Sequence, residues 1–151
     1  MSTNLFEAFP AGYRAMAGLE AALAKSSVPA ATRELVKMRS SQINGCAYCL
    51  DMHSKDARAA GETEERLYLL NAWREATVYT DAERAALALT EAITRISDAH
   101  VPAEIEAGAR EHYDDEAYAA LVFVIVAINA WNRLAITGHS EPGHYKPGAA
   151  A

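Results

Sequence analysis

The chain of 151 residues is 51% hydrophobic and 23% charged, and it carries a formal net charge of −6. This length and composition are typical of one soluble globular domain with a sizeable core. The acidic balance, without a cluster of Lys and Arg, argues against nucleic acid or an anionic membrane as the main partner. The first residues lack the regions of a signal peptide, and the longest apolar run, 117–128, is too short to span a bilayer. We therefore expect a cytoplasmic protein with no nucleic-acid or membrane partner.

Almost every segment predicts helix, because alanine is abundant and no run alternates apolar and polar residues long enough for a strand. We expect a single all-α domain over residues 1–151, with six to seven helices in a core at about 11–136. The tail, 138–151, contains Gly and Pro and is expected to be extended or partly disordered. In chain order the expected helices cover residues 11–25, 29–44, 46–60, 63–73 and 80–97, a segment opened by Pro102, and residues 114–134.

Local signals mark the ends of several of these helices. Asn44-Gly45 is a typical C-terminal stop, and Gly61 ends the following helix. Thr80-Asp81-Ala82-Glu83 has the form of a capping box, and Asp114 or Asp115 is expected to cap the last helix. The expected fold is therefore a succession of helices joined by short turns.

The last expected helix is apolar nearly all round, through residues such as Leu121, Val124, Ile125 and Ile128. Such a helix lies at the centre of a core or is covered by a subunit interface. Because a small helical domain has few neighbours to cover it, we expect a homo-oligomer.

The only two cysteines, Cys46 and Cys49, form a C-x-x-C motif that is followed four residues later by His53. On a helix these side chains would lie at about 0°, 300° and 340°, within one 60° stripe. A dithiol and an imidazole on one helical face suit redox chemistry or metal binding. Asp51 and Asp56 are close in sequence, but we expect both to point away from this stripe and assign them no role.

Redox chemistry is the favoured interpretation of the stripe. Unpaired N–H groups at the helix start would stabilise a thiolate, and His53 could take the thiol proton. The helix terminus favours Cys46 as the attacking thiol, whereas adjacency to His53 favours Cys49, so the residues alone leave this choice open. Zinc is the alternative, with Cys46, Cys49 and His53 as three ligands, but a single helix lacks the geometry of structural zinc sites. Inert cysteines are a further alternative.

Other polar residues have ordinary interpretations. Glu34, between Arg33 and Lys37, is typical of a solvated surface residue. A hairpin of the helices on either side of Gly45 would instead bring its carboxylate near the cysteines, to orient His53 or accept a proton. Four further histidines are interpreted as capping or exposed residues: His100, His112, His139 and His144.

The stretch 34–53 resembles the core signature of the AhpD-like alkylhydroperoxidase and carboxymuconolactone decarboxylase superfamily. It has Glu34, a C-x-x-C twelve residues later, His53 four beyond the second cysteine, and the S-x-x-N-x-C lead-in from Ser41. Residues 128–134 resemble the end of the last long helix in the peroxidase-like branch, so the resemblance covers most of the chain.

The resemblance implies an all-α fold whose subunits assemble into dimers, trimers or hexamers. It implies a thiol-dependent peroxidase that reduces a hydroperoxide substrate, uses an external dithiol reductant and needs no metal or organic cofactor. The peroxidatic cysteine of the family matches Cys49 and the resolving cysteine Cys46. Glu34 and His53 match the positions of the proton relay.

One residue departs from the pattern, because Tyr48 stands where some AhpD enzymes carry a second histidine. A phenol, whose pKa is ordinarily about 10, donates hydrogen bonds but shuttles protons poorly at neutral pH. The alternatives to a peroxidase are a redox-sensing or disulfide-exchange module with little turnover and a zinc-binding protein. Lactone decarboxylation is a further alternative, although the decarboxylase branch typically lacks the C-x-x-C pair.

Overall fold

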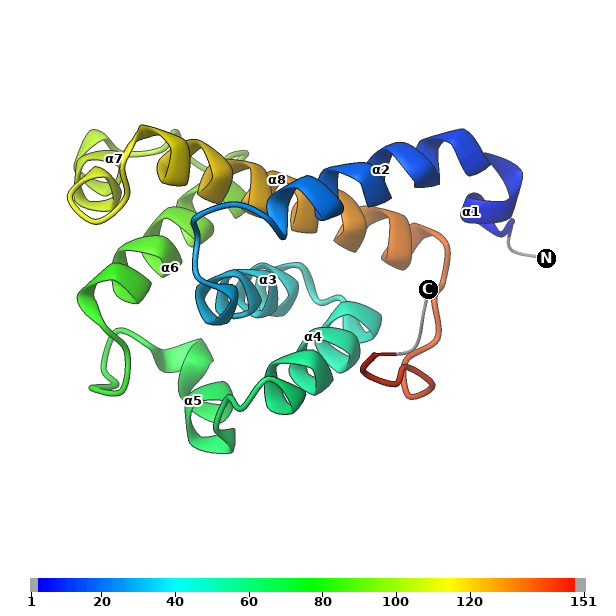
Figure 1. Cartoon of the computed structure of the whole chain (residues 1–151), viewed down its shortest axis with the longest axis horizontal. Helices are drawn as coiled ribbons and strands as arrows, with labels where there is room; N and C mark the ends of the chain where they lie inside the picture. Colours follow the sequence, from blue (N-terminus) through cyan, green and yellow to red (C-terminus); the bar gives the residue numbers. More distant parts are fainter. Residues whose placement is uncertain (1–2, 149–151) are drawn as a thin grey trace.

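The computed structural model describes residues 3–148, and every regular element among them is helical (Figure 1). The all-α expectation is therefore confirmed. In chain order the elements are α1 (Leu5–Ala8), α2 (Pro10–Leu23), α3 (Ala30–Asn44), α4 (Ala47–Ala59), α5 (Glu64–Leu69), the 3₁₀ turn η1 (Leu70–Ala72), α6 (Asp81–Thr94), α7 (Ala103–Arg110) and α8 (Asp115–Thr137).

The capping signals act where the sequence predicts them. Thr80 and Glu83 form a reciprocal capping box at the start of α6, and the Asp114 side chain accepts a hydrogen bond from the backbone of Ala117 at the start of α8. Gly45 ends α3 in the left-handed conformation, at φ 70°, which a side chain would disfavour. The short helix α1 was not expected, because a single helical turn leaves no periodic pattern in a sequence, and the helix expected over residues 63–73 divides into α5 and η1.

The central element is α3, which packs against α4, α6 and α8. Figure 1 shows α3 nearly end-on, with α8 running behind α2 along one side and α4 on the other. Eight residues of α3 are buried, among them the polar Ser40 and Ser41, because three neighbouring helices enclose it. The helix that carries Glu34 is therefore held from several directions.

The long helix α8 has the length and apolar composition of a membrane-spanning helix, but it packs along α2, α3 and α6. One side of it is buried through residues such as Leu121, Val124, Ile125 and Ile128. The other side leaves Phe123 and Val126 exposed. The apolar sequence therefore divides between a core face and a free face.

A polar network joins the end of α3 to α8. The Asn44 side-chain amide donates hydrogen bonds to the side-chain oxygens of Asn129 and Asn132, both at 2.9 Å. The fully buried Asn132 in turn donates to Ser41 Oγ at 3.0 Å. Because buried amides need partners, this network sets the register between α3 and α8 immediately before Cys46. It also gives the Ser41 and Asn44 positions of the S-x-x-N lead-in a structural role.

The segment after α8 has no regular structure but is held against α4. Asp51 Oδ2 accepts a hydrogen bond from the Gly143 backbone at 2.9 Å, and Lys55 donates to the Tyr145 carbonyl at 3.2 Å. Up to residue 148, the tail is thus irregular, as expected, and docked on the helix that begins with the cysteines. Residues 149–151 lie outside the described range.

Candidate functional site

The two cysteines lie where α3 ends and α4 begins. Cys46 is the N-cap residue of α4, and its Sγ accepts a hydrogen bond from the Cys49 backbone at 3.3 Å. The two residues are joined by a disulfide, with their Cα atoms 5.4 Å apart. Both sulfurs therefore lie in the first turn of a helix, where free N–H groups and the helix dipole stabilise a thiolate once the bond is reduced.

His53 follows Cys49 by one turn on α4 and is almost buried. Its Nδ1 lies 3.0 Å from Glu34 Oε2, on the facing helix α3. Because an ionised carboxylate only accepts hydrogen bonds, Nδ1 carries a proton, and in the neutral form of the ring Nε2 keeps a free lone pair. The hairpin of α3 and α4 thus brings Glu34 to His53. Of the two interpretations of Glu34, this is the one in which a hairpin places its carboxylate where it can orient His53.

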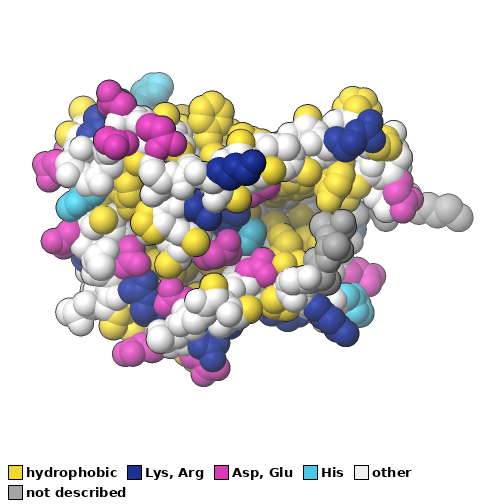
Figure 2. Space-filling model, in the orientation of Figure 1, with side chains coloured by type: hydrophobic (Ala, Val, Ile, Leu, Met, Phe, Trp, Pro, Cys, Tyr) yellow, Lys and Arg dark blue, Asp and Glu magenta, His cyan; other side chains and the backbone are white. Residues whose placement is uncertain are grey.

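A cavity of about 590 Å³ opens beside these residues. Cys49, His53 and Glu34 line it, whereas Cys46 does not, although both cysteines have an exposed fraction of only 1%. Figure 2 shows the molecule hollowed on this face, with hydrophobic side chains gathered in the hollow. Of the two cysteines, Cys49 is therefore the one that lies at the cavity.

Aromatic side chains form the apolar wall of the cavity. The rings of Phe6, Tyr13 and Trp131 lie 5.3 to 6.1 Å apart between centroids, and all three line the cavity. The exposed side chain of His144 lies at the cavity as well, so this histidine is exposed as expected but close to the site. The cavity is thus lined both by an apolar aromatic cluster and by the polar pair of Glu34 and His53.

A partly buried ion pair supports Glu34 from the side of α2. Lys37 Nζ lies 3.0 Å from Glu20 Oε2 and 3.9 Å from Glu34 Oε1. The other oxygen of Glu20 accepts a hydrogen bond from the Trp131 indole at 3.1 Å. Lys37 therefore bridges two carboxylates, and through Glu20 this bridge reaches the aromatic wall.

The surroundings of Glu34 keep it ionised. Burial alone would raise the pKa of its carboxyl, but the hydrogen bond from His53 and the charges of His53, Lys37 and Arg33 outweigh this effect. The pKa of Glu34 consequently lies below its ordinary value. An ionised Glu34 is what holds the His53 ring in one orientation and tautomer.

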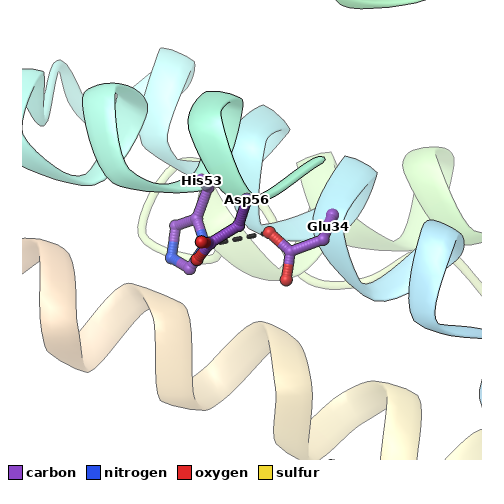
Figure 3. A group of neighbouring side chains, drawn as sticks. All are labelled: Glu34, His53 and Asp56. Atoms are coloured by element: carbon purple, nitrogen blue, oxygen red, sulfur yellow. Dashed lines mark hydrogen bonds and ion pairs between the residues drawn. The ribbon is translucent and has the colours of Figure 1, made fainter. Parts of the chain in front are cut away.

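The expectation that Asp56 points away from the cysteine stripe is wrong. Asp56 lines the cavity, and one ligand atom from each of Glu34, His53 and Asp56 lies within 4.8 Å of the others. Figure 3 shows His53 and Asp56 projecting from the same side of α4 toward Glu34 on α3. The reason is helical geometry, because a residue three positions after His53 lies on the same face. Asp51 does face elsewhere, toward Lys55 and Gly143.

Glu34, His53 and Asp56 are also the described residues whose spacing could hold a metal ion. The carboxylates of Glu34 and Asp56, however, already accept hydrogen bonds. Glu34 accepts from His53, Asp56 accepts from the Tyr145 hydroxyl at 2.7 Å, and the ammonium of Lys37 lies beside Glu34. While the disulfide is closed, the two sulfurs also supply no thiolate ligand. The arrangement favours proton transfer over metal binding.

Several residues at the cavity leave little trace in the sequence. Glu20 lies on α2, Trp131 on α8 and Tyr145 in the irregular segment after α8, and only the packing brings them to α3 and α4. Lys37 and Asp56 could have been predicted, because they lie three residues after the candidates Glu34 and His53 on the same helices. The spacing of i and i+3 positions is therefore the signal that could have found them.

The comparisons with known proteins agree on the superfamily. A sequence model of the "Carboxymuconolactone decarboxylase family" matches residues 8–92, which include Glu34, both cysteines and His53. The chain is also 50% identical over 133 residues to the uncharacterized protein YdfG of Bacillus subtilis strain 168, covering 88% of this chain and 90% of that protein.

Solved structures extend the likeness to the fold. A protein of unknown function from Agrobacterium tumefaciens, whose name links it to the antioxidant defence protein AhpD, is 36% identical with a TM-score of 0.90, over 95% of this chain and 99% of its own. The debrominase Bmp8 has the same fold, with a TM-score of 0.82 at 24% identity, over 92% of this chain and 75% of its own. Together with the family match and the identity to YdfG, these findings show that the chain belongs to the carboxymuconolactone decarboxylase family, within the AhpD-like superfamily.

Proposed function

We propose that the protein is a thiol-dependent peroxidase that reduces organic hydroperoxides through a dithiol–disulfide cycle of Cys46 and Cys49. The observation that carries this proposal is the position of Cys49, which lines the cavity one turn before the Glu34-bonded His53. A reactive sulfur, a base oriented by a carboxylate and an apolar chamber are the parts that such an enzyme needs. The Cys46–Cys49 disulfide is the oxidised product of the proposed cycle.

In the first step the thiolate of Cys49 attacks the distal oxygen of the hydroperoxide. An S–O bond forms, the O–O bond breaks, and the alkoxide leaves with a proton supplied through His53, so that Cys49 becomes a sulfenic acid and the product is an alcohol. The thiolate of Cys46 then attacks Sγ of Cys49, forming the disulfide and releasing hydroxide, which a proton converts to water. An external dithiol supplies the two electrons that restore both thiols.

The residues around Cys49 have separate tasks in this cycle. With its Nδ1 proton held by Glu34, His53 offers Nε2 as the site that takes the Cys49 proton and returns it to the leaving alkoxide. Tyr48 lines the same cavity and can donate a hydrogen bond to the peroxide. The relay thus depends on Glu34 and His53 rather than on a second histidine.

The shape of the cavity supports an organic substrate. Its volume of about 590 Å³ is larger than hydrogen peroxide requires. Its wall of Phe6, Tyr13 and Trp131 is apolar and suits a substrate with an organic substituent. An apolar substituent on the peroxide would displace water from these rings and gain binding free energy in proportion to the area buried. We therefore propose alkyl or aryl hydroperoxides as the substrate class.

The test is cumene hydroperoxide consumption with a dithiol reductant. Wild-type protein should turn over, Cys49→Ser should fall to background, and His53→Phe should lose about 100-fold or more in kcat, the range of general acid–base catalysis. Cys46→Ser should trap the Cys49 sulfenic acid, which dimedone labels, whereas Cys49→Ser should not be labelled.

Two results would contradict the proposal. Turnover of the wild type no faster than that of Cys49→Ser would leave the redox-sensing alternative, which predicts that the oligomer size differs between the reduced and disulfide forms. About one zinc per purified chain, together with unreactive thiols, would instead support the zinc-binding alternative.

A further inference from the structure

We propose that Tyr145 and Asp56 are positioning residues: the C-terminal segment 141–148 docks on α4, and its Tyr145 holds the Asp56 carboxylate beside the His53–Glu34 pair. This inference rests on the proposed function, because it names a further pair of residues that support the same proton relay. It assigns the segment a part in the chemistry of the site.

The segment is attached to α4 at three points. The Gly143 backbone donates to Asp51 Oδ2 at 2.9 Å, Lys55 Nζ donates to the Tyr145 carbonyl at 3.2 Å, and the Tyr145 hydroxyl donates to Asp56 Oδ1 at 2.7 Å. Lys55 is itself fixed by an ion pair with Asp51 at 2.8 Å. The backbone of the segment is therefore held independently of the Tyr145 hydroxyl, which is left to act on Asp56.

The Tyr145 hydroxyl is a permanent donor at neutral pH. Burial raises its pKa to about 12, and the hydrogen bond to Asp56 and the charges of Asp56 and Glu34 act in the same direction. Such a hydroxyl keeps its proton at neutral pH, so it donates a hydrogen bond to Asp56 and the negative charge stays on the carboxylate. Tyr145 also lines the cavity, so it contacts the site directly.

Asp56 acts on His53 through its charge. With Glu34 hydrogen-bonded to Nδ1 and Asp56 within 4.8 Å, the imidazole has two carboxylates beside it, one on α3 and one on its own helix. When His53 takes the Cys49 proton, both carboxylates stabilise the positive charge that forms. A carboxylate free to turn into solvent would lose this effect, and Tyr145 prevents that motion.

The test compares Tyr145→Phe and Asp56→Asn in the full chain. Each should lower kcat for cumene hydroperoxide about tenfold, the rate equivalent of one hydrogen bond to a charged group, with KM changed less than about twofold. Asn keeps an oxygen that accepts the Tyr145 hydrogen bond, so Asp56→Asn removes the charge but preserves the anchor. The double variant should be no slower than Asp56→Asn. Tyr68→Phe, a change of the same kind at a tyrosine that is 76% exposed, should retain wild-type rates.

A second measurement separates this inference from the peroxidase proposal. In a Cys46→Ser background, the rate of Cys49 alkylation by iodoacetamide at pH 7 should fall with Tyr145→Phe and with Asp56→Asn, whether or not the protein reduces peroxides. Wild-type alkylation and turnover in both variants would overturn the inference. So would a loss confined to Tyr145→Phe, because it would show that Tyr145 only anchors the segment.

Discussion

At the scale of single residues, the site is organised by the carboxylate of Glu34. One of its oxygens lies 3.0 Å from His53 Nδ1 and the other 3.9 Å from Lys37 Nζ, so a proton donor beside each oxygen stabilises the ionised form. Sequence spacing singled out His53 and the cysteines, and the family resemblance added Glu34, which the hairpin of α3 and α4 brings to His53. It could not identify Glu20 or Tyr145, whose distance in sequence from the hairpin hides their proximity in the fold.

Replacing Glu34 should produce a pH-dependent loss of stability. Burial works against its ionised form, but the hydrogen bond from His53 and the nearby cations lower the pKa of Glu34 below its ordinary 4.5. A carboxyl with a depressed pKa stabilises the fold above the unfolded value and loses this contribution as the pH falls through the folded value. Glu34→Gln should therefore lower the free energy of unfolding by about 1 to 2 kcal/mol at pH 7.

The measurement is thermal unfolding of both proteins from pH 7 down to pH 3. The gap between Glu34→Gln and wild type should close as the pH falls through the acid range. The exposed Glu65→Gln serves as the matched control and should follow the wild type throughout. A gap that stayed constant with pH would contradict the assignment of an ionised Glu34.

At the scale of elements, helix boundaries were predictable and helix partners were not. Local chemistry decides the boundaries, as with the Thr80 capping box and the left-handed Gly45. The contact of α3 with α8 depends instead on hydrogen bonds from Asn44 to Asn129 and Asn132, which lie 85 and 88 residues further along the chain. Nothing in the local pattern of an asparagine reveals a partner at that distance.

Asn132→Ala should destabilise the α3–α8 contact. The substitution removes two hydrogen bonds in a fully buried place and leaves the Asn44 amide and Ser41 Oγ with fewer partners. Because buried polar groups without partners are costly, the loss should be about 2 to 4 kcal/mol. Urea unfolding measures it as a lower midpoint. Ala in place of the adjacent, exposed Arg133 should change the free energy of unfolding by less than about 0.5 kcal/mol.

At the scale of the whole molecule, assembly into a homo-oligomer stays a prediction, and the free side of α8 is where we place its interface. Phe123 and Val126 are 55% and 48% exposed on a helix whose other side forms the core. Apolar side chains of this size on one helix face are typical of surfaces that meet a partner. The sequence indicated the apolar character of α8 but not which side would remain open, since that depends on how α2, α3 and α6 cover it.

Phe123→Glu should reduce the mass of the particle in solution. Burying an unpaired charge in an apolar interface is strongly unfavourable, so the variant should dissociate toward the monomer. Size-exclusion chromatography with light scattering measures this, and Tyr68→Glu, on the exposed surface of α5, should keep the wild-type mass. A wild-type protein that is monomeric, or a Phe123→Glu variant with the wild-type mass, would contradict the prediction.

The position of Cys46 outside the cavity lining also imposes an order of events in time. Since Cys49 is the cysteine that lines the cavity, peroxide and reductant in the proposed cycle must approach the same sulfur through the same opening. The reductant thiolate attacks Cys49, Cys46 leaves as a thiolate, and the mixed disulfide fills the chamber until the reductant's second thiol releases it. Oxidation and reduction therefore alternate as two half-reactions, and an excess of either reactant slows the entry of the other.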